Sequence, residues 1–287
     1  METMLEKGSA FIWQNARLLE RAIFAYHFLN GSPSQILKAL AAYQNEDGGF
    51  GHALEPDLRA AESQPLFVEF ALRTLYENKL RDADMAARAC DFLAHHSDLK
   101  RGIPTLLPSA MTYARAAHWN NPAAYEPSFD RLSGLVGLAS SQGIRHPWLE
   151  SAVGVCLVEI TEGKHDDSHT INNAFCLLES LSKTQNVDTL FAKLSGELFQ
   201  ANFFCLETPV RTYGLTPLAF APTPDSYCRP LFTDAQIDAH LDELASYQEA
   251  DGGWPIQWTP PGGTAVQEWR AFITVSSLVT LRAYGRI

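Results

Sequence analysis

Apolar residues recur every three or four positions along most of the 287-residue chain, which is the spacing of helices with one buried face. The helix predicted over 82–96 is the most polar, so we expect it in an outer layer. The pattern as a whole predicts an all-α protein. The ten predicted helices cover residues 10–29, 33–44, 63–77, 82–96, 129–141, 147–160, 169–181, 188–204, 233–248 and 264–284.

Start and stop signals support several of these boundaries. Asn30-Gly31 ends the first helix, and Ser32-Pro33 opens the next with an N-cap serine and a first-turn proline. Asp188 is predicted to cap a later helix. The helical pattern lapses over 101–127 and 207–232, where prolines gather, and we expect shortened helices or strand-like excursions there.

One segment occurs twice, near opposite ends of the chain. Residues 43–50 read Tyr-Gln-Asn-Glu-Asp-Gly-Gly-Phe, and residues 247–254 read Tyr-Gln-Glu-Ala-Asp-Gly-Gly-Trp. The glycines are expected to break the preceding helix, because glycine alone takes a positive φ without a steric penalty. The following aromatic, Phe50 or Trp254, should bury itself against the helix end. Gln44 and Gln248 are expected to bond the freed backbone groups.

This Gln-x-x-Asp-Gly-Gly-Trp/Phe segment resembles the repeat of the terpenoid cyclases and protein prenyltransferases. The resemblance implies an α/α toroid, in which inner and outer helices alternate around a central cavity. The position of the two copies near opposite ends favours a single domain over 1–287. It implies a fold more than an activity, since one fold hosts many functions.

The chain lacks the chemical motifs of that superfamily. The acid Asp-x-Asp-Asp of class II cyclases is not completed, because Asp82-Ala83-Asp84 is followed by Met85. The magnesium motif Asp-Asp-x-x-Asp ends in Thr170 instead of aspartate, and no Asp-x-Cys zinc motif occurs. Cyclisation and zinc-dependent prenyl transfer are therefore both unsupported, and we expect no metal and no cofactor.

Composition excludes several classes of partner and of structure. The net charge of −11 argues against a nucleic-acid partner. No run of 18 apolar residues and no signal-like N-terminus occur, so we expect a cytoplasmic protein without a membrane span. Five widely spaced cysteines predict neither a disulfide framework nor a zinc knuckle. They are Cys90, Cys156, Cys176, Cys205 and Cys228.

The loop after the first Gly-Gly turn carries the strongest candidate chemistry. Close carboxylates separate their pKa values, so that one can act as an acid and another as a base. Asp57 is the predicted acid or base, with the charge of Glu55 or Glu62 beside it. Glu55, Glu62 and His52 are the other predicted catalytic residues, and Arg59 is a predicted substrate-binding residue. The alternative is a solvated acidic loop with Arg59 as a local ion pair.

The matching C-terminal loop supplies predicted substrate-binding residues, which a toroid would place on the same rim as the first loop. A charge on an inner helix, such as Glu268, is costly unless it faces a wet cavity. The alternative is a core Trp269 whose charged neighbours face outward. The predicted binding residues are Trp254, Trp258, Glu268, Trp269 and Arg270.

A third candidate, His165-Asp166-Asp167-Ser168-His169, contains metal-ligand residue types. We favour a turn that caps the following helix, because the spacing identifies no distant set of ligands. Three functions stay open. The resemblance implies an enzyme acting on an isoprenoid or another apolar molecule in a central cavity, where aromatic faces stabilise cations. The alternatives are a carbohydrate-active hydrolase or lyase that uses paired carboxylates, and a non-catalytic binding or scaffold protein.

Overall fold

The computed structural model describes residues 2–287, and among them regular structure is helical apart from isolated bridges. The all-α prediction is confirmed. Among these residues no helix is both long and apolar enough to cross a membrane. The α-helices are α1 Met4–Asn15, α2 Leu18–Phe28, α3 Pro33–Ala41, α4 Pro65–Glu77, α5 Ala83–His96, α6 Leu132–Ser141, α7 Pro147–Glu162, α8 Ser168–Leu181, α9 Asp188–Leu198, α10 Pro217–Phe220, α11 Asp234–Ser246 and α12 Gly263–Ala283.

The chain forms two compact units. Unit 1 contains both ends of the chain, up to Leu40 and Phe203–Ile287, and unit 2 is the continuous segment Ala41–Asn202. The predictions of a closed toroid and of one domain over 1–287 concern the arrangement of these units, and they stay predictions.

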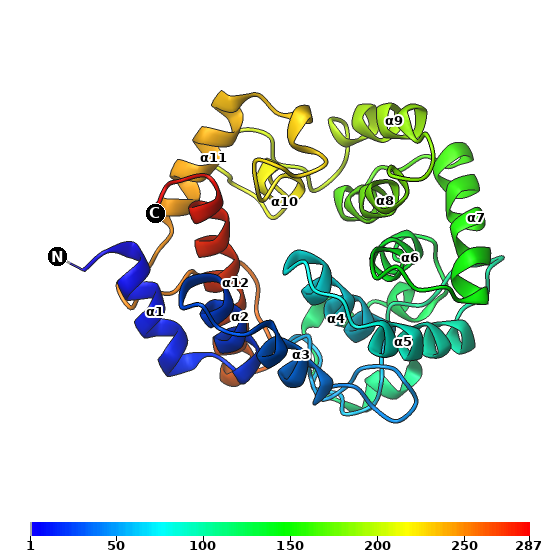
Figure 1. Ribbon diagram of the computed structural model, residues 1–287, viewed down its shortest axis with the longest axis horizontal. Coiled ribbons are helices and arrows are strands. Elements are labelled where there is room, and N and C mark those ends of the chain that lie inside the picture. Colours follow the sequence, from blue (N-terminus) through cyan, green and yellow to red (C-terminus); the bar gives the residue numbers. More distant parts are fainter. Residues whose placement is uncertain (1) are drawn as a thin grey trace. The chain divides into compact units, whose positions relative to one another are not determined.

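Unit 2 consists of two helical layers. Helices α4, α6 and α8 pack side by side, and α5, α7 and α9 cover one face of them (Figure 1). The contact between α6 and α8 is very close because α6 carries glycines there: a Cβ on Gly134 would lie 2.6 Å from Asn173, and one on Gly137 would lie 2.5 Å from the Leu177 backbone. The polar helix α5 lies in the second layer, as its composition suggests.

Unit 1 joins the two ends of the chain. Helix α1 packs on α12, and α2 contacts both α1 and α12. Gly8 of α1 allows this approach, since a Cβ there would lie 2.8 Å from the Leu278 side chain. The N-terminal helix is therefore part of the C-terminal structure.

The two Gly-Gly turns have the same hydrogen-bond pattern. Gln44 Nε2 donates to Gly48 O at 2.9 Å, and Gln248 Nε2 donates to Gly252 O at 2.9 Å. In each turn the last glycine N–H donates to the aspartate side chain at 3.0 Å. Phe50 and Trp254 are both buried, as predicted.

Each turn also contacts a helix distant in sequence, through equivalent atoms. Gln44 Nε2 donates to Met85 O in α5 at 3.0 Å, and Gln248 Nε2 donates to Met4 O in α1 at 2.9 Å. Three residues on, the carbonyls of Arg88 and Lys7 lie against Gly48 and Gly252, respectively. Helix α1 therefore contacts the second turn through the same positions with which α5 contacts the first. The N-terminal helix thus completes the C-terminal repeat.

The glycine with positive φ is the first of each pair. Gly48 has φ +87° and Gly252 has φ +90°, whereas Gly49 and Gly253 have no positive φ. The second glycine is required because a side chain would not fit there. A Cβ on Gly49 would lie 2.5 Å from Ser63, and one on Gly253 would lie 2.7 Å from Phe11.

Two predicted helices differ from those observed. The helix expected over 10–29 is two helices, separated at Ala16 and Arg17, where Asn15 turns its side chain back to the Phe11 carbonyl at 2.9 Å. The helix expected over 188–204 ends at Leu198, and Val187 rather than Asp188 is its N-cap. Asn202 lies beyond it and pairs with Asp166 and Ser168 through the backbone.

The two proline-rich segments are irregular, as expected. Residues 101–127 contain three 3-10 helices, η1 Pro108–Thr112, η2 Ala117–Asn120 and η3 Pro122–Tyr125. Residues 207–232 contain α10 and the 3-10 helix η4 Arg229–Leu231.

Candidate functional site

Most of the loop after the first Gly-Gly turn is buried, and its backbone is unusual. His52 and Ala53 both have positive φ, +57° and +56°. Their N–H groups donate to Ala61 O at 3.2 Å and Ala60 O at 2.9 Å, so the loop folds back on itself. Successive non-glycine residues in this conformation cost about 1–3 kcal/mol each and gather at functional sites. The segment enclosed by these two hydrogen bonds includes Glu55 and Asp57, and both of these side chains are buried in unit 2.

A second segment pairs with this loop and adds an imidazole to it. Leu58 and Arg115 form an antiparallel bridge, in which Ala116 N donates to Asp57 O at 2.8 Å. This pairing leads directly into η2, which carries His118. His118 Nε2 lies 3.5 Å from Asp57 Oδ2.

The resulting cluster has two buried carboxylates and one half-exposed imidazole. The side chain of Asp57 is 4% exposed and that of His118 is 49% exposed. Glu55 is also buried, and its Oε2 accepts a hydrogen bond from Asp57 N at 3.0 Å. Burial lowers the pKa of His118, and the charge of Asp57 opposes this effect without cancelling it. His118 is thus neutral at neutral pH and has a carboxylate beside one ring nitrogen.

Two other predicted residues of this loop, His52 and Glu62, lie at its surface. Glu62 is exposed and accepts a hydrogen bond from the Tyr113 hydroxyl at 2.9 Å, which raises the pKa of Tyr113. His52 is exposed, and the backbone N–H of Arg59 donates to Ala114 O at 2.9 Å. Of the predicted catalytic residues, Glu55 and Asp57 are therefore brought together.

The predicted binding residues of the C-terminal loop lie in unit 1, where two of them support the turn. Trp254 is buried and donates through Nε1 to Leu244 O at 2.8 Å. Arg270 binds the turn residue Asp251 with two nitrogens, each at 2.8 Å, and stacks over the Phe11 ring at 4.6 Å.

The remaining three form an aromatic and acidic group on and before α12. Trp258 and Trp269 meet edge to face with centroids 5.2 Å apart, and Glu268 is buried. The shared rim proposed for these residues and Asp57 would span both units and stays a prediction.

The third candidate, around His165, is a helix cap with a pocket beside it. The side chain of Asp167 accepts from the backbone of His169 at 2.8 Å, which makes it the N-cap of α8. His165 Nδ1 lies 3.0 Å from Glu197 Oε2, and Lys193 holds the other oxygen of Glu197 at 2.8 Å. Among residues 2–287 no three His, Cys, Asp or Glu side chains are grouped as they would need to be to hold a metal.

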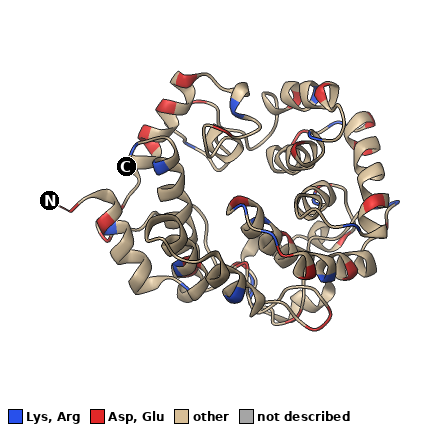
Figure 2. Ribbon diagram, viewed as in Figure 1, with Lys and Arg blue, Asp and Glu red and all other residues tan. Residues whose placement is uncertain are grey.

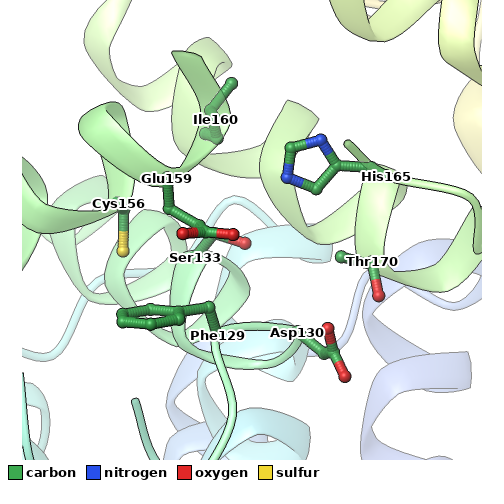
Figure 3. Close-up of a pocket in the computed structure, with 8 residues that line it drawn as sticks. All are labelled: Phe129, Asp130, Ser133, Cys156, Glu159, Ile160, His165 and Thr170. Carbon is green, nitrogen blue, oxygen red and sulfur yellow. The ribbon is translucent and has the colours of Figure 1, made fainter. Parts of the chain in front are cut away.

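Figure 3 shows this pocket, in which His165 and Glu159 point toward one another across the opening. The cavity holds about 20 Å³ for the centre of a water molecule, which suits one or two waters and not a substrate. Burial raises the pKa of the Cys156 thiol to about 12, so this cysteine is not a ready nucleophile. The lining residues are Phe129, Asp130, Ser133, Cys156, Glu159, Ile160, His165 and Thr170.

Sequence reasoning missed His118 and a charged network on α4. His118 lies in an irregular segment whose pairing with the loop is long-range, so no local signal indicated it. Glu69 and Arg73 did leave a signal, because two charges four residues apart interrupt an otherwise apolar helix.

Comparison with known proteins supports the fold alone. No known family model matches the chain, and no curated protein matches it. Among solved structures, the crystal structure of a protein from Actinoplanes aligns with a TM-score of 0.56 and 16% sequence identity, over 98% of this chain and 98% of that chain. The likeness covers nearly the whole length and carries no information about activity.

Proposed function

We propose that this chain is an enzyme that moves a proton to or from a small molecule, with His118 as the proton-transferring group and Asp57 as its partner. The observation that supports this is the buried Asp57 carboxylate 3.5 Å from a neutral, half-exposed imidazole. A separation of this length is common in ligand-free sites, where catalytic hydrogen bonds shorten on substrate binding.

The pair has a defined division of roles. Asp57 faces Nε2 of His118, so it favours the tautomer in which Nε2 carries the proton. Nδ1 then holds a lone pair and accepts a proton from the substrate. The Asp57 carboxylate stabilises the imidazolium that forms, as a carboxylate beside a catalytic histidine does in other acid–base sites. Glu55, fixed by the backbone N–H of Asp57, holds the loop in shape.

The substrate class in this proposal comes from the resemblance to terpenoid cyclases and prenyltransferases. We propose an α/α toroid in the cytoplasm that binds an isoprenoid or another apolar small molecule in its central cavity. The equivalent construction of the two Gly-Gly turns supports the fold part of this proposal. The Trp119 ring lies beside His118 with centroids 4.5 Å apart and a tilt of 59° between the rings, and it provides an aromatic group next to the proposed base.

A carbohydrate-active site is less well supported. Hydrolysis with two carboxylates needs both groups to reach opposite sides of the scissile bond. Glu55 and Asp57 are instead both buried, and Glu55 is tied to the backbone of the same loop. The non-catalytic alternative is an outcome of the test that follows.

The test combines ligand discovery with matched variants. Mass spectrometry of small molecules that co-purify with the protein identifies a ligand, and the ligand and its chemical relatives are then assayed for turnover. Asp57→Asn and His118→Gln should each lower turnover by about 10²–10⁴-fold, the usual contribution of a positioned acid or base. Glu62→Gln is the control, since Glu62 bonds Tyr113 at the surface of the same loop.

His118→Gln is the deciding variant because its side chain is half exposed and its loss leaves the core intact. Full turnover in both His118→Gln and Asp57→Asn would reject the proposed roles. A ligand that binds and is never converted would favour the binding-protein alternative.

A further inference from the structure

Two arginines on the first layer of unit 2 share one carboxylate. Arg73 Nη2 bonds Glu69 Oε1 at 3.1 Å, and Arg131 Nη1 bonds Glu69 Oε2. Glu69 and Arg73 lie one turn apart on α4, and Arg131 precedes α6. Burial alone would raise the pKa of Glu69, but the two arginines outweigh it and lower that pKa. The group therefore carries two positive charges and one negative charge.

Further side chains hold each guanidinium in place. Arg73 Nη2 also donates to Asn173 Oδ1 at 3.1 Å, and Asn173 Nδ2 donates to Asp130 O at 3.2 Å. Arg131 Nε donates to Thr105 Oγ1 at 3.1 Å. The arginines are thus fixed by α8 and by the segment before α6, and ordering them on ligand binding costs little entropy.

Both guanidiniums keep donors to spare. Within the described part of the chain, Nε and Nη1 of Arg73 and Nη2 of Arg131 make no hydrogen bond. The two side chains are 24% and 23% exposed, so both arginines are partly open to solvent. Figure 2 shows α4 carrying both acidic and basic positions, whereas α11 carries mainly acidic ones.

We propose that Arg73 and Arg131 form a binding site for the carboxylate group of a small organic acid. Glu69 shows that the spacing suits a carboxylate, because it gives one oxygen to each arginine. Guanidinium forks bind planar carboxylates with geometric specificity. The incoming carboxylate would take the remaining donors and balance the excess positive charge of the group Glu69, Arg73 and Arg131.

The surroundings limit what this site accepts. Glu77 lies one turn beyond Arg73 on α4, and its charge acts on Arg73. A ligand with several negative charges would be repelled there, which favours a monocarboxylate over a phosphate. The chain carries a net charge of −11, so anions adsorb only weakly elsewhere on its surface. Binding at a specific site can therefore be distinguished from unspecific binding.

The probes are acetate, benzoate and inorganic phosphate, titrated at low ionic strength and followed by NMR of the arginine Nε–H signals. Saturable binding of a carboxylate with a Kd on the order of 1 mM is expected for so small a ligand. Arg131→Gln and Arg73→Lys should each weaken it at least tenfold. Arg286→Gln is the control, since Arg286 pairs with Asp238 and Asp242 on α11 and should leave the affinity unchanged.

Thr105→Val is a milder variant for the case that an arginine substitution prevents folding. It removes the hydrogen bond that holds Arg131 without removing a charge, and it should weaken carboxylate binding several-fold. Three results would overturn the proposal: no saturable carboxylate binding below about 10 mM, equal affinity in wild type and all three site variants, or phosphate bound tenfold tighter than either carboxylate. The test does not involve Asp57 or His118, so its result is independent of the proposed acid–base function.

Discussion

Substituting alanine for the first glycine of each turn tests whether the turns are built as described. In Gly252→Ala the new Cβ would stand 2.2 Å from the Lys7 carbonyl oxygen, at a φ of +90°. In Gly48→Ala the Cβ would stand 2.2 Å from the Arg88 carbonyl oxygen, at a φ of +87°. Each substitution therefore combines backbone strain with a clash against a helix.

The expected cost is the sum of two contributions. A non-glycine residue at such a φ costs about 1–3 kcal/mol. Moving the turn away from the helix also breaks the bond from Gln248 Nε2 to Met4 O, or from Gln44 Nε2 to Met85 O, at about 0.5–1.5 kcal/mol. The total of about 1.5–4.5 kcal/mol lowers the melting temperature by roughly 3–18 °C in a protein of this size.

Urea and thermal unfolding, followed by circular dichroism at 222 nm, measure this loss. Two glycines serve as controls, since neither would meet an atom within 4 Å. Gly262→Ala adds strain alone, at φ +99°, and Gly196→Ala in α9 adds neither strain nor clash and should stabilise by about 0.5–1 kcal/mol. If Gly252→Ala and Gly48→Ala cost no more than Gly262→Ala, the contact between turn and helix is not as described.

Three further outcomes follow. Gln248→Ala should destabilise by about 1–3 kcal/mol, measured by urea unfolding, because it removes two hydrogen bonds to backbone carbonyls; an unchanged midpoint would contradict this. Arg270→Gln should cost about 1 kcal/mol at pH 7. Arg270 lowers the pKa of Asp251, so the stability that this pair adds is fully present above the ordinary aspartate pKa. That stability is lost as the pH falls through the lowered pKa of Asp251. If Arg270→Gln costs as much at pH 2 as at pH 7, this account of the pair is wrong. In maleimide labelling at pH 8, the partly exposed Cys205 should react first, because burial raises the pKa of Cys156 and of Cys176 to about 12; early labelling of either buried thiol would refute this.

The helices were predictable because their signal is local. Apolar spacing places most helices within a few residues of their observed bounds, and Asp-Gly-Gly marks both turns. The partners of the turns were not predictable, since Gln248 bonds a carbonyl 244 positions away and Gln44 bonds one 41 positions away. The sequence also did not indicate which glycine of each pair takes the positive φ, and in both turns it is the first, the one that lies against the opposing helix.

The candidate site was predicted in part. Glu55 and Asp57 could be selected because carboxylates in a loop after a helix-ending turn are a recognisable pattern. Their burial and the addition of His118 depend on a bridge between Leu58 and Arg115, two segments without regular periodicity. Glu69 and Arg73 could have been selected, because a charge pair inside an apolar helix needs partners from neighbouring helices.

The acid–base pair is tested most directly by NMR titration of His118 in the wild type and in Asp57→Asn. The folded pKa of His118 is lowered, so we expect it to stay neutral below the pH at which a free histidine takes up its proton, with the Nε2–H tautomer populated. Asp57→Asn removes the charge that raises this pKa, so the variant should titrate at still lower pH. A His118 pKa at or above the ordinary value, or one that Asp57→Asn leaves unchanged, would contradict the proposed pair.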